Sequence, residues 1–589
     1  MSRGRTFAGP FVGVIFCVMV FVLVGFVARF GVDAPAQDDW RVVPYATGDM
    51  PVTLDWLFTP HGGHVIALPK FVGVMTLKFT GVRYPIVMLL NVALLALATL
   101  LVLKGIRHWR GQWSVIDATV PLILLNPGQI ENVIWAFQLC FTLVGFLVAL
   151  ALWTTLRRRT PDARQNTWPM LLVGVCGVML AFTSNAGLAY ALCCATWVAV
   201  CGFMSTRRLD RAMGLSAAGL IGVAAGVSMW MVTTTPRTFP VELSNFTDLP
   251  RGVVAAMSGA CGGMLMNLGG WWRGGATLLL CAAALSIALL QLRQRPTDRH
   301  ALLGAALVIV GALGAATMIA LGRGAFTPVA VTMSRYVTLI SPALVGAYVV
   351  FAVLLDRRWS RLIGATIGVG MAVVIVAPGG AVGAAVRFAE ARHDRLDLFV
   401  RDARAGHGDE YLASRHATWQ VAEDNLRSTQ QPFGMLRRAR AGPFRDVTIV
   451  PEPLPAWARV DVPVNIVDSN DMTFPTPTIG RYGGVDPYLS FSLGASREVL
   501  AVEVTCRIVP RRAGEWSLFQ FFWHDEGRNH AAPGERNVYM KISPDPEVRT
   551  FGVWVFDRIN RFRIDPERLG GEIEILKLTV HVRDDGSTN

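Results

Sequence analysis

Long runs of apolar residues recur along the chain up to about residue 378, and short polar segments separate them. A helix of about 20 apolar residues is long enough to span the hydrocarbon core of a bilayer. By that measure the sequence predicts an anchor at 11–30, followed by ten further spans. These are 84–103, 114–127 (short), 131–154, 168–184, 186–204, 212–233, 273–292, 301–321, 337–355 and 361–378. We therefore expect an α-helical polytopic membrane protein with about eleven spanning helices.

Basic residues gather in every second connection between these spans. The clusters are Lys104/Arg107/Arg110, Arg157/Arg158/Arg159, Arg207/Arg208/Arg211, Arg293/Arg295/Arg299 and Arg357/Arg358/Arg361. The positive-inside rule then predicts a cytoplasmic N-terminus and, after an odd number of spans, a C-terminal part outside the membrane. Residues 252–269 are apolar but glycine-rich, and counting them as a span would break this pattern. We expect a re-entrant or interfacial helix there, with a twelfth span as the alternative.

The pattern changes after the last predicted span. Residues 379–440 are charged with helical periodicity, which predicts a helical neck. From about residue 441 short alternating segments appear, which predict strands. The segments are 447–450, 488–493, 499–508, 517–523, 550–556 and 572–582. Strands of this spacing indicate a C-terminal β-sandwich of jelly-roll type at 441–589. Its aromatic residues Trp516, Trp523 and Trp554 are candidates for sugar binding, although core packing is the more common role for a strand tryptophan.

Composition supports a membrane protein and argues against a nucleic-acid-binding one. Hydrophobic residues make up 52% of the chain and charged residues 16%, with a mean hydropathy of +0.43. The net charge of +13 comes with arginines that lie in short loops between apolar runs, so it indicates topology. Eight of the nine cysteines lie in or beside apolar segments without metal-ligand spacing, and they are expected to be packing residues.

Candidate chemistry begins directly after the anchor. Asp38, Asp39 and Trp40 form an acidic motif close to the membrane, where carboxylates are costly unless they are hydrated or used. Two adjacent acids can divide roles, one as a base and one supporting its partner or a cation. In the same loop, His61 and His64 form a HisGlyGlyHis segment, which fits either metal ligands, a phosphate-binding turn or hydrogen-bonded loop histidines.

Further polar groups lie at the same predicted end of the spans. Lys70 falls in an amphipathic stretch, 65–80, that is expected to lie flat on the membrane. The segment 126–138 carries Gln129 and Glu131, which need either inter-helix partners or a cavity. Two arginines, Arg323 and Arg335, lie where the positive-inside rule disfavours cations. A bound anion would explain them, and the guanidinium fork suits phosphate.

Taken together, these motifs resemble those of the GT-C glycosyltransferase superfamily. AspAspTrp at 38–40 is similar to the acidic motif of the first outer loop, and HisGlyGlyHisValIleAlaLeuProLys at 61–70 is similar to a segment of bacterial members. The segment 129–138 and the GlyArg…SerArgTyr pair around 322–336 also resemble bacterial members. The resemblance covers roughly residues 1–378. The predicted C-terminal sandwich is similar to that of some bacterial arabinosyltransferases.

The resemblance implies a hexosyl- or pentosyltransferase in the bacterial inner membrane that takes part in cell-envelope polysaccharide synthesis. It implies a polyprenyl-phosphate-linked sugar donor and a glycan or lipid-linked glycan acceptor, with transfer at the outer face. Carried over to this chain, Asp38 is the general base, and Asp39 orients the acceptor or helps bind a cation. Arg323 and Arg335 bind the donor phosphate. The remaining candidates are His64 and Lys70 for the phosphate, and Trp40, His61, Gln129, Glu131 and Tyr336 for the acceptor or the cavity.

The chain departs from the family pattern in its second acid, which is Asp where Glu is commoner, and in His61, where Asn is expected. These departures leave the choice of base and the need for a divalent cation open. Two other classes remain as alternatives: a transporter or flippase of lipid-linked glycans, and an O-antigen ligase or polymerase. No clear internal repeat supports a transporter, and the acidic pair in the first loop argues against a ligase. A silent scaffold whose β-domain binds glycan is a third alternative.

Overall fold

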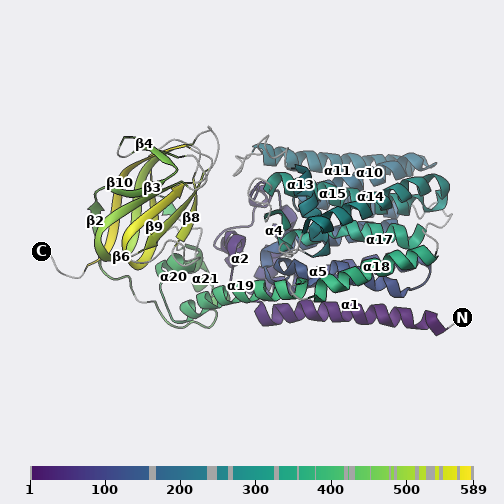
Figure 1. Ribbon diagram of the computed structural model, residues 1–589, viewed down its shortest axis with the longest axis horizontal. Coiled ribbons are helices and arrows are strands. Elements are labelled where there is room, and N and C mark those ends of the chain that lie inside the picture. The colour runs from purple at the N-terminus through teal and green to yellow at the C-terminus, as the bar shows by residue number, and fades with distance from the viewer. Residues whose placement is uncertain are drawn as a thin grey trace. The chain divides into compact units, whose positions relative to one another are not determined.

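Helices make up the described chain before residue 417, and strands dominate the chain after it. The computed structural model describes residues 3–157, 167–234, 249–262, 270–323, 330–354, 357–377, 380–416, 422–423, 431–451, 453–476, 479–482, 487–510, 517–524, 537–542, 548–566 and 571–584. They belong to two compact units (Figure 1). The helical unit holds residues 1–42 and most of the chain from Pro51 to Asp394; the β unit holds 43–50 and 395–589.

Long apolar helices alternate with short ones in the helical unit. They are α1 (Arg3–Phe30), α3 (Leu54–Phe58), α4 (Ala67–Phe79), α5 (Tyr84–Arg110), α6 (Thr119–Leu124), α7 (Ile130–Ile134), α8 (Leu139–Thr155), α9 (Thr167–Ala181), α10 (Asn185–Met204), α11 (Arg208–Thr234), α13 (Leu249–Ser258), α14 (Gly270–Gln294), α15 (Arg299–Arg323), α16 (Val337–Ile340), α17 (Pro342–Leu354), α18 (Arg357–Val376) and α19 (Ala381–Arg404), which continues into the β unit. Local sequence sets their ends. In α5, a proline lies in the first turn and Gly111, at φ +78°, closes the last.

Nine helices in the described ranges are long and apolar enough to cross a membrane. The chain is therefore a multi-pass membrane protein, while the predicted number of eleven spans is not confirmed. Two predicted spans account for the difference. Residues 114–127 form a 3₁₀ turn (Val115–Ala118) and the short helix α6, which ends before Pro127, since the residue before a proline disfavours the helical conformation. The span predicted at 168–184 corresponds to α9, which has 15 residues.

The glycine-rich stretch at 252–269 falls on α13 and a 3₁₀ turn at Gly259–Cys261, and residues 263–269 lie outside the described part. With 10 residues, α13 is about 15 Å long, half the thickness of a hydrocarbon core. It cannot cross a bilayer alone, and the choice between a re-entrant or interfacial helix and a twelfth span stays a prediction.

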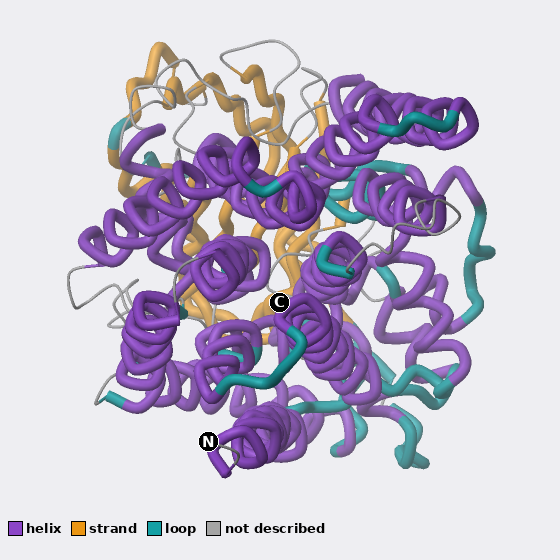
Figure 2. Tube along the Cα trace, turned by 90° about the vertical axis from the view of Figure 1, so that its right-hand side faces the viewer, coloured by secondary structure: helices purple, strands orange, loops and turns teal. Residues whose placement is uncertain are grey.

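Small residues let the long helices approach one another closely. A Cβ added at Gly214 of α11 would lie 2.8 Å from the Cα of Gly202 in α10, and one at Gly311 of α15 would lie 2.4 Å from the Tyr190 ring. Association inside a membrane depends on such close packing, because lipid offers no hydrophobic penalty to apolar helix faces. The long helices run side by side (Figure 1), and Figure 2 shows several of them nearly end-on.

The β unit begins with helices and continues as one antiparallel sheet. Its helices are α2 (Val43–Thr47), the end of α19, α20 (Asp409–His416) and α21 (Gln431–Arg438). The strands pair in the order β4-β5-β10-β6-β9-β7-β8, with β1 on β9, β2 on β10 and β3 on β6. They are β1 (Ala422–Glu423), β2 (Trp457–Val462), β3 (Ile466–Asn470), β4 (Met472–Thr476), β5 (Ile479–Tyr482), β6 (Tyr488–Pro510), β7 (Ser517–His524), β8 (Asn537–Ile542), β9 (Val548–Pro566) and β10 (Gly571–Arg583).

Alternating side chains of the long strands form a single core. Val502 and Val504 of β6 are fully buried, together with Val553 of β9 and residues of β7 and β10. Breaks in the β6–β9 register, as between Ser492 and Arg497, are positions at which strands bend. Pairing is continuous among the described strands, so it does not divide them into the two sheets of the predicted sandwich. The predicted strand at 447–450 is irregular, with Val450 84% exposed.

Two of the tryptophans proposed as sugar ligands, Trp523 and Trp554, are buried. Trp523 and Trp554 are each 3% exposed, and the Trp554 ring packs 5.6 Å from that of Trp457. Trp516 lies outside the described residues. For Trp523 and Trp554 the sugar-binding interpretation is wrong, because both side chains are buried. Trp523 lies in the sheet core, whereas Trp554 lies on the opposite face from Val553 and Val555 and packs against Trp457.

Candidate functional site

The acidic pair lies on a short 3₁₀ turn, Gln37–Arg41, which we call the acidic turn. Asp39 closes this turn locally. Its backbone N–H donates to the Ala36 carbonyl oxygen at 3.0 Å, and its Oδ2 accepts from the Ala36 N–H at 3.1 Å. Gln37 has φ +49°, in the left-handed region that side chains rarely adopt. The turn thus holds an uncommon backbone conformation directly beside both carboxylates.

Asp38 and Asp39 are neighbours in sequence but occupy different environments. The Asp38 side chain is 39% exposed, and its Oδ1 lies 3.2 Å from Nε2 of His61. Burial alone would raise the pKa of Asp38, but the hydrogen bond and charge of His61, with Arg41 and Arg335, lower it overall. Asp39 is 3% exposed, and burial raises its pKa to about 7. The pair thus offers one accessible, ionised carboxylate and one buried carboxyl that titrates near neutrality.

The HisGlyGlyHis segment is a tight turn that brings His61 to Asp38. The backbones of His61 and His64 exchange hydrogen bonds of 2.8 and 3.0 Å across two glycines at φ +55° and +79°. Glycine adopts those angles without steric cost. The His61 ring then lies 4.9 Å from the Phe137 ring and within contact distance of Asp38. His64 supports the turn through its backbone, and its predicted role in phosphate binding stays a prediction.

Lys70 lies in the first turn of α4 and supports the preceding loop. Its Nζ donates to the carbonyl oxygens of Trp56 and Thr59, both at 2.7 Å, and lies 5.1 Å from the centroid of the Trp56 ring. Burial lowers the pKa of Lys70 to about 8. Two of the three N–H donors of this ammonium group are therefore used inside the protein.

Gln129 is buried and bonded within the bundle. Its Nε2 donates to the Leu124 carbonyl oxygen at 2.7 Å, and its Oε1 accepts from the Thr338 hydroxyl at 2.5 Å. Asn132 donates to the same hydroxyl at 2.7 Å. These contacts are the inter-helix hydrogen bonds that the sequence left as one alternative.

Glu131 and Arg335 form the charged part of this polar layer. Oε2 of Glu131 accepts from the Ser334 hydroxyl at 2.8 Å and from the Arg335 N–H at 3.0 Å. Oε1 lies 3.8 Å from Nη1 of Arg335, a loose ion pair, and the Arg335 guanidinium lies 5.5 Å from the centroid of the Tyr336 ring. Arg335 thus has a carboxylate nearby and keeps donors that a further anion can use.

Trp135 links the acidic turn to two arginines. Its ring is 1% exposed, and its Nε1–H donates to the Ala36 carbonyl oxygen at 3.2 Å. The guanidinium carbons of Arg335 and Arg392 lie 5.9 and 5.1 Å from the ring centroid, within cation–π range. Arg392, on α19, is also the cation that acts most strongly on Asp39. The structure therefore gathers Asp38, Asp39 and Arg335 around one tryptophan.

Sequence patterns did not single out Trp135 or Arg392 as site residues. Trp135 lies inside the 129–138 segment, in which the polar residues Gln129 and Glu131 were the predicted candidates. Arg392 lies in the charged stretch after the last predicted span, where arginines are frequent and no local signal marks one of them.

A small pocket borders Asp39 and Lys70. Its other walls come from the acidic turn, α4, α5 and the start of α8, and they are apolar: Val42, Ile66, Pro69, Gly73, Leu77, Val87, Ala136, Phe137 and Leu139. Asp39 and Lys70 thus face a common, mostly apolar space, which accounts for the opposite directions in which burial moves their pKa values.

The remaining predicted residues are Trp40, Tyr336 and Arg323. Trp40 and Tyr336 are buried, at 4% and 6% exposure. Arg323 ends α15, and its side chain lies outside the described part. Among the residues the structure describes, no three His, Cys, Asp or Glu side chains are grouped so that they could hold a metal ion.

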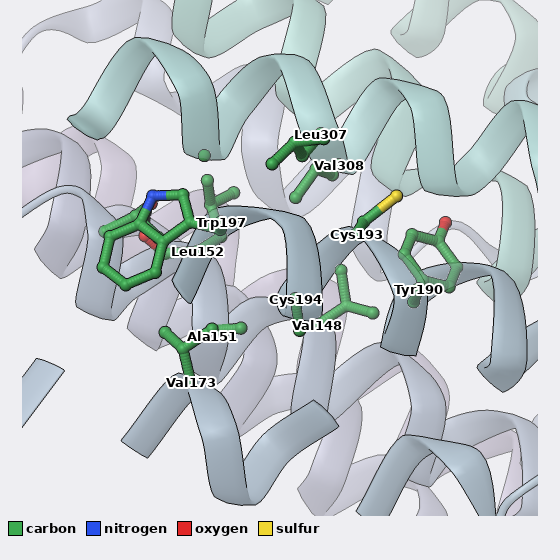
Figure 3. Close-up of a pocket in the computed structure, with 12 residues that line it drawn as sticks. Val148, Ala151, Leu152, Val173, Tyr190, Cys193, Cys194, Trp197, Leu307 and Val308 are labelled. Atoms are coloured by element: carbon green, nitrogen blue, oxygen red, sulfur yellow. Dashed lines mark hydrogen bonds between the residues drawn. The ribbon is translucent and has the colours of Figure 1, made fainter. Parts of the chain in front are cut away.

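A second small pocket lies between α8, α9, α10 and α15 (Figure 3). In that view Tyr190 and Trp197 flank aliphatic side chains such as Val148 and Leu307. Its lining contains no carboxylate and no cation. This space is suited to an apolar group and does not carry acid–base chemistry.

No family model matches the sequence, and no curated protein matches it. Among solved structures, the arabinosyltransferase EmbB from Mycobacterium smegmatis is similar to it at 12% sequence identity and a TM-score of 0.30. The match covers 96% of this chain and 64% of EmbB, so the chain spans just under two thirds of that protein's length. A TM-score of 0.30 assigns no activity to this chain.

Proposed function

We propose that this protein is a membrane glycosyltransferase that moves a sugar from a polyprenyl-phosphate donor to an acceptor hydroxyl. The observation that supports this most strongly is Asp38: a half-exposed carboxylate, 3.2 Å from His61, whose pKa is lowered by His61, Arg41 and Arg335. A general base must be accessible and ionised, and a leaving phosphate needs a cation close by. Asp38 and Arg335 meet these two requirements within one site.

In the proposed step, the acceptor hydroxyl attacks the anomeric carbon of the donor sugar. Its proton passes to Asp38, the bond between the anomeric carbon and the phosphate oxygen breaks, and the electron pair stays on the phosphate. The donor phosphodiester carries one negative charge and the polyprenyl phosphate product carries up to two. Arg335 stabilises the charge that develops, which is where preorganised donors contribute most.

The other residues either support Asp38 or are further candidates for binding the donor phosphate. His61 orients Asp38 and holds it ionised, while Lys70 and His64 fix the loop that presents His61. Arg323 is a second candidate for the phosphate. The topology predicted by the arginine clusters places this site at the outer face of a bacterial cytoplasmic membrane, with a glycan or lipid-linked glycan as acceptor.

The test is transfer by the full chain in lipid vesicles, using a panel of pentosyl and hexosyl polyprenyl phosphates together with oligosaccharide acceptors and measuring released polyprenyl phosphate. We expect the wild type to consume at least one donor. Asp38→Asn should lower the rate about 10³-fold, because a positioned base contributes 10²–10⁴-fold. Thermal unfolding should be unchanged.

Asp55→Asn is the matched control, since Asp55 is an exposed acid in the same loop. It should keep the wild-type rate. A wild type that leaves every donor intact, or an Asp38→Asn protein as active as Asp55→Asn, would refute the proposal.

A further inference from the structure

Arg392 is a charged residue that the proposed reaction does not yet use. It lies on α19, in the last part of the helical unit, and far along the chain from the acidic turn. Its guanidinium carbon lies 5.1 Å from the centroid of the Trp135 ring. A guanidinium over a tryptophan ring is attracted by the ring quadrupole, and this cation–π contact holds the charge beside the ring.

A chain of contacts leads from Arg392 to the acidic turn. The Trp135 Nε1–H donates to the Ala36 carbonyl oxygen at 3.2 Å, and the Ala36 N–H donates to Oδ2 of Asp39 at 3.1 Å. Arg392 also acts on Asp39 directly, as its strongest cationic neighbour. Both paths end at the residue that closes the turn, and Asp38 immediately precedes it.

Trp135 is also connected, through Phe137, to His61, which orients Asp38. Its ring lies 6.3 Å from that of Phe137, which in turn lies 4.9 Å from the ring of His61, the ion-pair partner of Asp38. Loss of this cation would therefore loosen both the turn that carries Asp38 and the histidine that orients it.

We infer that Arg392 is a positioning residue of this site: held over the Trp135 ring and balancing the charge of Asp39, it fixes the turn that presents Asp38. Its effect on transfer rests on the proposed function, whereas its coupling to Asp39 does not. A misplacement of about 1 Å at a reacting group can cost 10²-fold in rate, so a residue that touches no substrate can still matter.

The test compares Arg392→Gln, Arg392→Lys and the control Arg387→Gln, which removes an exposed arginine from the same helix. Transfer by Arg392→Gln should fall about 10- to 10²-fold at unchanged donor KM, since positioning acts on the chemical step. Arg392→Lys keeps the charge but not the guanidinium and should recover part of the loss. Arg387→Gln should match the wild type.

A second readout needs no enzymatic activity. Thermal unfolding is followed between pH 5 and 8 in the wild type, Arg392→Gln, Asp39→Asn and the double variant. The charged or titratable groups around Asp39 are Asp38, Arg392, Lys70 across the pocket and Tyr84. Without Arg392 the negative charge of Asp39 is less balanced by a cation. The unfolding temperature should therefore fall more steeply with rising pH. The steeper slope should vanish in the Asp39→Asn background.

Additive effects of the two substitutions, with an unchanged pH slope, would overturn the inference even if the wild type is an active transferase. A raised donor KM with unchanged turnover would also overturn it, because it would make Arg392 a direct phosphate ligand. If the wild type consumes no donor but the pH-dependent coupling appears, the proposed function fails and the positioning role of Arg392 stands.

Discussion

Two clusters of charged side chains lie at opposite ends of α5, about 40 Å apart by helix rise. At one end Asp117 is completely buried and accepts four hydrogen bonds. Two come from Nη1 of Arg110 (2.8 and 3.0 Å), one from the Ser114 N–H (2.8 Å) and one from the Tyr348 hydroxyl (2.7 Å). At the other end lies the acidic turn, whose Asp39 acts electrostatically on Tyr84.

The two clusters differ in how many of their hydrogen-bonding sites are used within the protein. A carboxylate offers about four lone-pair sites, and Asp117 fills them with protein donors. Within the described residues, Asp38 has one ion-pair partner, His61, and keeps 39% of its side chain exposed. Arg335 holds its carboxylate partner Glu131 only loosely, at 3.8 Å. A closed network stabilises a fold, whereas an open one is available for a ligand, so the clusters should respond differently to the same kind of substitution.

The largest expected effect on stability is at the closed cluster. Asp117→Asn leaves Arg110, whose side chain is 15% exposed, without a counter-charge and should lower the free energy of unfolding by about 3 kcal/mol. Asp38→Asn should change it by less than about 1 kcal/mol, because the Asp38 side chain is 39% exposed and a solvent-screened ion pair contributes little. Chemical unfolding of both variants in the same lipid environment measures the difference. Equal losses of unfolding free energy would show that the Asp38–His61 pair is structural, like the Asp117–Arg110 pair.

The next effect depends on pH. The pKa of Asp39 is raised to about 7 in the folded protein from 3.8, so the folded state holds the proton more tightly. Asp39 thus contributes stability that is complete below pH 3.8 and is lost as the pH rises towards 7. Three pKa units correspond to about 4 kcal/mol at most. Asp39→Asn should be more stable than the wild type at pH 8 and should gain little at pH 5; unfolding curves with parallel pH dependence would contradict this.

Arg335→Gln tests the cation of the open cluster. Its transfer rate should fall about 10²-fold, because a lost transition-state donor typically costs 10²–10³-fold. Glu131→Gln, the matched control, leaves Arg335 charged and keeps an oxygen that can accept from Ser334, so it should cost less than about tenfold. Steady-state transfer with both variants measures the ratio. Similar losses in both would indicate that the Glu131–Arg335 pair acts as a structural unit.

Much of the fold could be predicted from sequence because membrane burial imposes a strong, local pattern. The predicted span 84–103 lies within α5, and predicted strands at 488–493 and 499–508 lie on one strand, β6. The failures have local causes. Proline shortened α6, and strand alternation could not tell which face of the sheet Trp523 and Trp554 occupy.

The site was harder to predict because its properties come from residues distant in sequence. Asp38 and Asp39 are adjacent, yet one pKa is lowered and the other raised: burial raises both, but at Asp38 it is outweighed by His61, Arg41 and Arg335, whereas at Asp39 it prevails. No sequence signal assigns Arg392 to the ring of Trp135. Glutamine at 129 looked like a cavity residue because its partner, Thr338, lies beyond any local window.

The smallest expected effects are those of substituting one tyrosine in each cluster. Tyr348→Phe removes a single hydroxyl donor from Asp117, which keeps its bonds to Arg110 and Ser114, so unfolding should cost about 1 kcal/mol less and transfer should not change. Tyr336→Phe removes the hydroxyl that hydrogen-bonds to the Arg335 side chain and should affect transfer instead, by a few-fold. Unfolding and transfer are measured on both variants. If Tyr348→Phe slows transfer as much as Tyr336→Phe, the two clusters are coupled and the contrast between a closed and an open network does not hold.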